Sequence, residues 1–276
     1  MDTIVARKMR ATLEPVHAMV YFAPEALDAW GRLFPYRSMG YFASRSAPMG
    51  AVGPSVVTAA FYNFAPAAVA RAVPAVWEHA DPATVLTARG AAADAALVRL
   101  LGEGVIGSPE MAWAATTAER AARACPVEGR PLFGGHADLP WPERPHLRLW
   151  HAVTLLREFR GDGHVASLLS AGLSGIEAVA SYAATGDEFD AAFYRRSRGW
   201  GEEAWASAEE ALVRRGWLAD GALTEAGLAA REHIEATTDR LAMAPWFAIG
   251  EDDADRLRQT VRPWSRAIVA AGGLGF

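Results

Sequence analysis

Apolar residues recur along most of this chain at intervals of three and four positions, the spacing of one face of a helix. Alanine, leucine, arginine and glutamate, which all favour helices, fill many of the positions between them. The pattern therefore predicts a mainly α-helical protein. The predicted helices cover residues 4–22, 24–33, 55–62, 67–79, 91–101, 108–124, 146–160, 164–170, 175–184, 202–215, 224–241 and 251–271.

Three segments interrupt the helical pattern. Residues 35–54 are rich in glycine, proline and serine and are expected to form a loop. Residues 126–145 hold five prolines and three glycines, which predicts a crossover between an N-terminal half, 1–125, and a C-terminal half, 146–276. The triplet Gly161-Asp162-Gly163 is expected to end the helix over 146–160, with Asp162 capping the helix that follows.

One phrase occurs twice, as LTARGAAA at residues 86–93 and as LTEAGLAA at residues 223–230. Each copy follows an alanine-rich stretch and opens another one. A winged-helix unit ends in the same order, with a helix, a short strand-like wing and then the start of the next helix. The repeat predicts two duplicated winged-helix-like (helix-turn-helix) domains in a pseudo-two-fold arrangement, with very short β wings and the second wing over residues 217–223. The alternative is chance matching between alanine-rich helices.

Residues 210–227 resemble the end of MarR-type winged-helix domains, in which a reading helix ends in Arg-Gly before the wing. Most of the chain also resembles a helix-turn-helix family of actinobacteria. That resemblance rests on three phrases, which are His17-Ala18, residues 45–50 (RSAPMG) and residues 150–164 (WHAVTLLREFRGDGH). It implies a fold and leaves the activity open.

Composition indicates the cellular compartment of the protein. The 276 residues carry a formal net charge of −5 and one cysteine, Cys125, so no intrachain disulfide is available. The first residues lack the apolar core of a signal peptide, and no run approaches the length of a membrane span. We therefore expect a cytoplasmic protein with no membrane partner.

The charge pattern disfavours DNA as a partner. Arginine and lysine supply most of the affinity of a reading helix for phosphates, yet the C-terminal candidate begins with Glu202 and Glu203. The wing lacks an arginine at its tip, and Pro74 interrupts the corresponding helix of the first half. Three arginines, Arg195, Arg196 and Arg198, precede the C-terminal reading helix and are available to touch a DNA backbone.

Two histidines inside apolar helical runs suggest a binding site between the halves. If the halves face each other, His17 and His151 share a cleft and bind an acidic ligand or, only in a common cavity, a metal. The alternative is that each is a core histidine bonded to a neighbour. The candidate ligand-binding residues are His17, Tyr41, Arg45, His151, Arg157, Glu158 and His164.

The other candidates rest on local clusters. Glu158 follows His151 by seven positions, which places both on one helix face for orientation or acid–base work, although a helix end with surface ion pairs explains the same residues. Arg45 stands near several aromatic residues, a combination that suits a planar carboxylate or a hydrophobic metabolite, while an aromatic core under a turn is the alternative. The common nucleotide and hydrolase motifs are absent from the sequence, and the sequence leaves the cofactor unknown, with haem at His17 and His151 one candidate.

These observations favour a protein that binds a small hydrophobic or carboxylate ligand on a winged-helix scaffold that has largely lost DNA reading, with an enzyme of specialised metabolism as one form of it. The alternatives are a ligand-responsive MarR-like regulator that binds DNA and an interaction module without a ligand. A homodimer is compatible with each of these functions.

Overall fold

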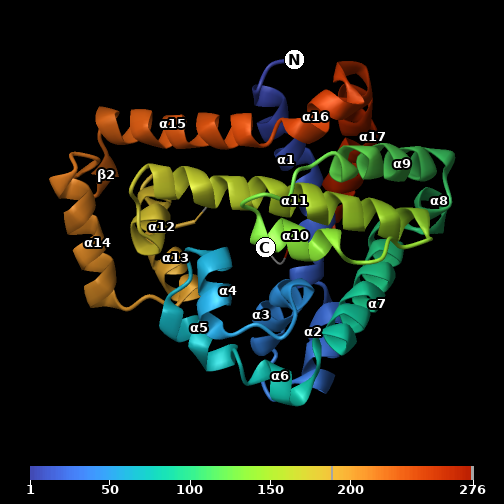
Figure 1. Ribbon diagram of the computed structural model, residues 1–276, viewed down its shortest axis with the longest axis horizontal. Helices are drawn as coiled ribbons and strands as arrows, with labels where there is room; N and C mark the ends of the chain where they lie inside the picture. The colour runs from blue at the N-terminus through green and yellow to red at the C-terminus, as the bar shows by residue number, and fades with distance from the viewer. Residues whose placement is uncertain (188, 275–276) are drawn as a thin grey trace.

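Helices make up most of the computed structural model, which describes residues 1–187 and 189–274 (Figure 1). The N-terminal part contains α1 (Ile4–Ala18), α2 (Pro24–Leu33), α3 (Met39–Ser46), α4 (Pro54–Phe61), α5 (Pro66–Ala72), α6 (Val76–His79), α7 (Pro82–Leu101), α8 (Glu103–Ile106), α9 (Pro109–Arg123) and α10 (Pro131–Ala137), with 3₁₀ turns η1 (Met19–Tyr21) and η2 (Ala47–Met49). The rest contains α11 (Pro145–Ser170), α12 (Gly175–Ala183), α13 (Ala191–Arg198), α14 (Glu202–Arg214), β1 (Leu218–Ala219), β2 (Ala222–Leu223), α15 (Glu225–Leu241), α16 (Ala244–Ile249) and α17 (Glu251–Ala270).

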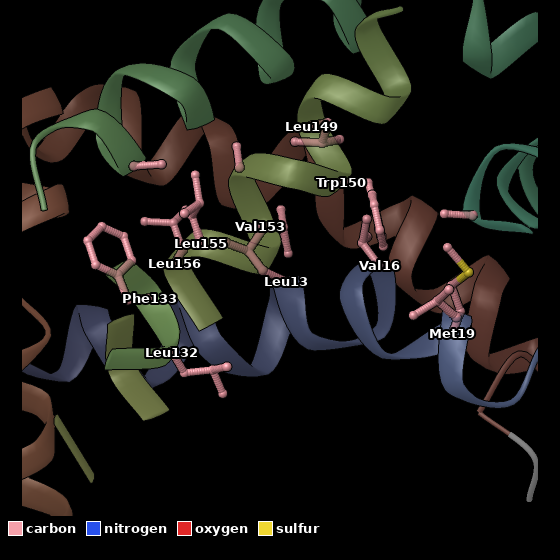
Figure 2. Packing of buried hydrophobic residues seen from close by; sticks show 14 of the residues in the cluster. Leu13, Val16, Met19, Leu132, Phe133, Leu149, Trp150, Val153, Leu155 and Leu156 are labelled. Atoms are coloured by element: carbon pink, nitrogen blue, oxygen red, sulfur yellow. The ribbon is translucent and has the colours of Figure 1, made fainter. Parts of the chain in front are cut away.

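Helix α11 runs through the middle of the molecule and is the element around which the others pack (Figure 1). Its apolar residues are buried on several sides, so it lacks the single polar face of a surface helix. Figure 2 shows Val153 and Leu156 of α11 close to Leu13 of α1 and to Phe133 of α10. The first and the central helices therefore belong to one core.

The prediction that Gly161-Asp162-Gly163 ends a helix is wrong, because α11 continues through all three residues. Gly163 leaves room for Arg130, since a Cβ there would lie 2.9 Å from its guanidinium nitrogen. That guanidinium donates to the carbonyl oxygens of Phe159 and Leu241. Asp162 accepts a hydrogen bond of 2.9 Å from the backbone N–H of Phe133 and caps no helix of its own. Packing across α11 therefore outweighs the low helix propensity of glycine.

Most buried apolar side chains of the described residues belong to one of two hydrophobic clusters. The larger cluster joins buried residues between 6 and 159 with those of α16 and α17. The smaller cluster lies between residues 168 and 234, in the last turn of α11, α12, α13, α14, the wing and α15. The predicted domain boundaries at 126–145 stay a prediction, and the hydrophobic packing groups the residues differently, since the C-terminal helices return to the larger cluster.

The smaller cluster carries a helix-turn-helix with a wing. Helix α13 ends at Arg198, and the φ of 75° at Gly199 allows the tight turn into α14. Strands β1 and β2 pair antiparallel, with Leu218 opposite Leu223. Thr224 then caps α15 by accepting from the N–H of Gly227. The wing predicted over residues 217–223 is confirmed.

The first copy of the repeated phrase stands in a different setting. Residues 86–93 lie inside α7, which begins at Pro82 after the capping residue Asp81. The prediction that this copy launches a helix after a wing is therefore wrong, and the two strands of the described residues both belong to the second copy. Because alanine, leucine and arginine suit any helix, the phrase alone did not distinguish a helix start from a helix interior.

Two further predictions fail, one because of close packing between helices and one because of a proline. The loop expected over residues 35–54 contains α3, because Gly40 lets this helix lie directly against the Trp30 side chain of α2. The helix expected over residues 67–79 is divided into α5 and α6, since Pro74 has no N–H to continue it.

In the described part of the chain no single helix is long and apolar enough to cross a membrane. One pair, α11 with α12, is long and apolar enough when the two helices are taken together, but it is bent by 100°.

The helix-turn-helix unit is fixed to α4 and α5 by close backbone contacts. Gly175, at the start of α12, approaches Tyr62 so closely that a Cβ would lie 2.0 Å from the Tyr62 carbonyl oxygen. Gly199 lies against the side chain of Ala68, since a Cβ at Gly199 would lie 2.5 Å from the Ala68 Cβ. The indole N–H of Trp200 donates to the Asn63 carbonyl at 2.9 Å.

We expect Gly175→Ala to lower the free energy of unfolding by about 1–3 kcal/mol, because its methyl group forces the backbone at Tyr62 to move. Gly90→Ala is the matched control, since a Cβ at Gly90 meets nothing within 4 Å and alanine stabilises a helix interior by up to about 1 kcal/mol. Urea unfolding of both variants measures the difference. Equal effects would mean that the contact at Tyr62 is not tight.

Candidate functional site

Five helices bring charged and polar side chains together inside the larger hydrophobic cluster. Most of these side chains are almost fully buried, which is unusual for ionisable groups. The buried polar cluster consists of His17 on α1, Arg45 on α3, Arg89 on α7, His136 on α10, and His151, Arg157 and Glu158 on α11.

The carboxylate of Glu158 lies between two arginines. Arg157 donates to Glu158 at 2.7 Å, and Arg45 places two nitrogens 3.4 and 3.5 Å from the two carboxylate oxygens. Burial alone would raise the pKa of Glu158, but Arg157 and Arg45 hold it well below its usual range. Glu158 is therefore ionised, and it pairs with these arginines rather than orienting His151 as one sequence prediction had it.

Arg89 has no carboxylate partner. Its side chain is among the largest fully buried ones of the described residues, and none of the ion pairs found there includes it. One guanidinium nitrogen is 3.4 Å from the hydroxyl of Tyr21, and Nε has no hydrogen-bond partner. The guanidinium also stands over the ring of Trp150, with 5.1 Å from its carbon to the ring centroid. Among the described residues, the hydrogen-bond and ring contacts of this buried cation are thus one hydroxyl group and two aromatic rings.

His17 has a defined tautomer. Thr154 donates its single hydroxyl proton to the Trp150 carbonyl at 2.8 Å, so Nδ1 of His17, 3.0 Å from the same hydroxyl oxygen, is the donor. Burial holds the pKa of His17 well below its usual range, and the ring is neutral. Its Nε2 is therefore an acceptor, and it has no hydrogen-bond partner.

His136 and His151 complete the buried polar cluster. Both ring nitrogens of His136 lack hydrogen-bond partners, and burial, followed by the charge of Arg89, holds its pKa well below the ordinary value. Burial and the charge of Arg89 also lower the pKa of His151 to about 4. The ring of Trp141 packs edge-on against His151 at 4.8 Å between centroids. Three neutral histidines therefore lie close enough to Arg89 for its charge to lower their pKa values further.

An aromatic group flanks the buried polar cluster. The guanidinium of Arg45 lies 4.3 Å from the ring centroid of Phe61, and its Nη1 is 3.4 Å from the hydroxyl of Tyr41. The rings of Tyr41, Phe42, Phe61 and Phe64 pack with centroids 5.3 to 6.2 Å apart. A crevice of about 20 Å³ between α1, α11 and α16 reaches Arg157 and gives room for a water molecule.

The structure brings six of the seven predicted site residues together, and His164 lies apart from them. Nδ1 of His164 is 3.0 Å from the hydroxyl of Thr238 and 3.8 Å from the carboxylate of Glu235, in a separate polar network between α11 and α15. Among the described residues no group of three or more His, Cys, Asp or Glu side chains has the arrangement of a metal site.

Sequence reasoning missed Arg89, His136 and Tyr21. A signal for Arg89 exists, since it stands on the buried stripe of α7 between Val85 and Ala93. An arginine at a core position of an apolar stripe needs an explanation. His136 lies in the proline- and glycine-rich segment, where helical spacing gives no information.

Helix α14, which the sequence predicts as the reading helix, has an acidic surface. Glu202, Glu203 and Glu210 are exposed on α14, at the outer edge of the molecule in Figure 1. Two of the three arginines expected to touch DNA are engaged within the protein. Arg195 pairs with Glu202 at 2.7 Å, and the guanidinium of Arg198 stands over Phe64.

A family model described as a helix-turn-helix family matches residues 6–275. The chain therefore belongs to a helix-turn-helix family. No curated protein and no solved structure matches the chain.

The three histidines of the buried polar cluster predict that acid destabilises the fold at pH values above the usual pKa of carboxylates. Unfolded histidine binds a proton near pH 6.5, whereas His17, His136 and His151 stay neutral in the fold down to much lower pH. The unfolded state thus binds more protons, and stability falls by about 1.4 kcal/mol per histidine for each pH unit below about 6.5. For His151 this continues to about pH 4.

Urea unfolding at several pH values between about 7.5 and 5.5 measures this slope. His136→Gln removes one of the titrating groups and should make the slope shallower by about one proton. Stability that does not change over this range would show that the histidines are protonated in the fold.

Proposed function

We propose that this helix-turn-helix protein binds a small organic carboxylate in the buried polar cluster. The observation that carries the proposal is Arg89, a buried guanidinium without a carboxylate partner. Burying an unpaired charge costs several kcal/mol, so an isolated arginine in a core weakens the fold. A bound carboxylate supplies the missing charge, and the guanidinium fork matches its two oxygens.

A second group of the ligand is indicated by His17. Its Nε2 is a buried acceptor without a partner, which fits a ligand that donates an O–H or N–H. The nitrogens of His136 lack partners as well. A carboxylate that also carries a hydroxyl or amide satisfies more of these atoms than a simple acid does. A neutral His17 has the form of a general base, so an enzyme of specialised metabolism is one form of this function.

The body of the ligand is hydrophobic. Around the charged groups lie the rings of Tyr21, Tyr41 and Trp150, which favour an aromatic or aliphatic carboxylate over a sugar acid. Entry requires neighbouring side chains to separate, and the crevice at Arg157 marks one approach to the buried polar cluster.

We infer that the scaffold is a MarR-type winged helix that has largely lost DNA reading. The order α13, α14, wing and α15 supports this kinship, while the acidic face of α14 opposes the phosphates of DNA. A ligand-responsive regulator is the alternative, and the exposure of α14 favours it. Duplication of two winged-helix halves stays a prediction that this proposal does not need, and a homodimer is compatible with it.

We expect Arg89→Met to raise the stability of the free protein and to abolish ligand binding. Replacing a buried unpaired charge by an apolar side chain of similar length removes its desolvation penalty, a gain of about 1–4 kcal/mol. Melting of the wild type with 4-hydroxybenzoate, benzoate and the uncharged benzamide provides the probes. The hydroxybenzoate should give the largest shift, benzamide none, and Arg89→Met none with any probe.

Arg99→Met is the control, because Arg99 forms a half-exposed ion pair with Glu25 at 2.5 Å, away from the buried polar cluster. It should keep every ligand shift of the wild type. A large loss of stability in Arg89→Met, together with no shift of the wild type by any carboxylate, would assign Arg89 a structural role and reject the proposal.

We further expect that selection from a random pool of duplex DNA at low salt enriches no sequence motif. The first turn of α14 presents Glu202 and Glu203 where a reading helix needs donors for phosphates and base edges. Sequencing of the retained pool gives the result. An enriched motif whose binding is lost on Ser207→Glu, which adds a negative charge to the exposed face of α14, would instead support the regulator.

A further inference from the structure

A second feature that suits anions lies between the first and the last helices, away from the buried polar cluster. Helices α1 and α17 form the two sides of an open groove of about 520 Å³. This volume is within the range of about 300–1,000 Å³ that is typical of small-molecule sites. The groove is lined by Lys8, Ala11, Thr12 and Pro15 of α1 and by Arg258, Arg262, Ser265, Arg266, Val269 and Ala270 of α17.

Four cations line the groove, and none of its lining residues is acidic. Arg258, Arg262 and Arg266 follow one another at intervals of four residues, so they form a row on one face of α17 with a rise of about 6 Å between neighbours. Lys8, the one lysine of the sequence, adds a charge from α1. The protein as a whole carries a net charge of −5, so this groove is a local exception.

Most of this positive charge is not neutralised within the described part of the protein. Arg258 has an ion pair of 3.6 Å with Asp255, while no ion pair there involves Lys8, Arg262 or Arg266. Both hydroxyl groups are engaged, since Ser265 of α17 donates to the Thr12 carbonyl of α1 and Thr12 donates to the Lys8 carbonyl of its own helix. The free donors of the groove are therefore the cations.

The rest of the groove is apolar. Ala11 and Pro15 on α1 and Val269 and Ala270 on α17 contribute methyl and ring carbons, and Val269 is 45% exposed. The bond from Ser265 to the Thr12 carbonyl holds the two helices together beneath it. A row of cations beside an apolar surface is complementary to a molecule with several negative charges at one end and a flat apolar body at the other.

We propose that the groove between α1 and α17 binds an organic diphosphate of nucleotide size. A phosphate carries up to about two negative charges, whereas a carboxylate carries one. A diphosphate therefore balances the four cations of the groove better than a single carboxylate does. Guanidinium groups bind phosphate oxygens through two parallel hydrogen bonds, and the row of arginines reaches two successive phosphates. The ring system of the ligand then covers Val269 and Pro15.

Isothermal titration of the whole protein with ADP, pyrophosphate and adenosine at low salt tests this proposal. We expect ADP to bind most tightly, pyrophosphate more weakly and adenosine not at all. Arg262→Gln with Arg266→Gln should weaken ADP binding at least about tenfold. Both arginines are exposed, so the double variant should fold, and Lys8→Gln gives a second variant with a smaller loss.

The matched control is Arg214→Gln with Arg240→Gln, which removes the same charge from exposed positions on α14 and α15. It should bind ADP as the wild type does. Equal losses in both double variants, or no saturable binding of ADP, would overturn the proposal. Duplex DNA bound through Arg262 and Arg266 by a protein that binds no nucleotide would also overturn it and assign the groove to nucleic acid.

Discussion

The buried carboxylate of Glu158 is the group on which the arrangement of the interior depends. It faces Arg157 from its own helix and Arg45 from α3. An ionised carboxylate in a core is tolerated only with charged partners and hydrogen bonds, so α3 must lie against α11 for either charge to be buried. The same contact positions Phe61 under Arg45, which brings the aromatic group to the buried polar cluster. One ion pair thus fixes both the charged and the apolar side of the site.

Beyond this pair the cluster holds more positive charge than a purely structural core requires. Buried polar groups that serve the fold are normally hydrogen-bonded, and an apolar core would be more stable than a partly satisfied network. His17, Arg89 and His136 each retain a buried nitrogen without a partner. Stability gives no reason for these atoms, and functional sites are where such a loss of stability is expected, which is why we place the proposed ligand here.

The aromatic group lies between the helix-turn-helix unit and the buried polar cluster. Arg198, at the end of α13, stands 4.9 Å from the ring centroid of Phe64, and that ring packs against Tyr41 beside the cluster. The backbone N–H of Ala65 donates to the Arg198 carbonyl at 2.9 Å. The arginine nearest the turn is therefore used for docking within the protein, while glutamates face outward from α14. A family fold associated with DNA here presents a surface that opposes it, which is why fold alone does not assign the function.

The sequence predicted what depends on local spacing and failed where a distant contact decides. Most of the helices and the wing follow from apolar periodicity and a turn, and polar residues inside apolar runs pointed to six candidates that lie together in the core. Gly163 looked like a helix end because its contact with Arg130, 33 positions away, is invisible to local propensity. Arg89 was overlooked for the opposite reason. Its surroundings read as ordinary helix, and only its place on the buried stripe of α7 distinguishes it from a surface arginine. A charged residue at a core position of a regular helix is therefore a stronger signal of a site than a repeated phrase, because burying it has a physical cost that the phrase does not.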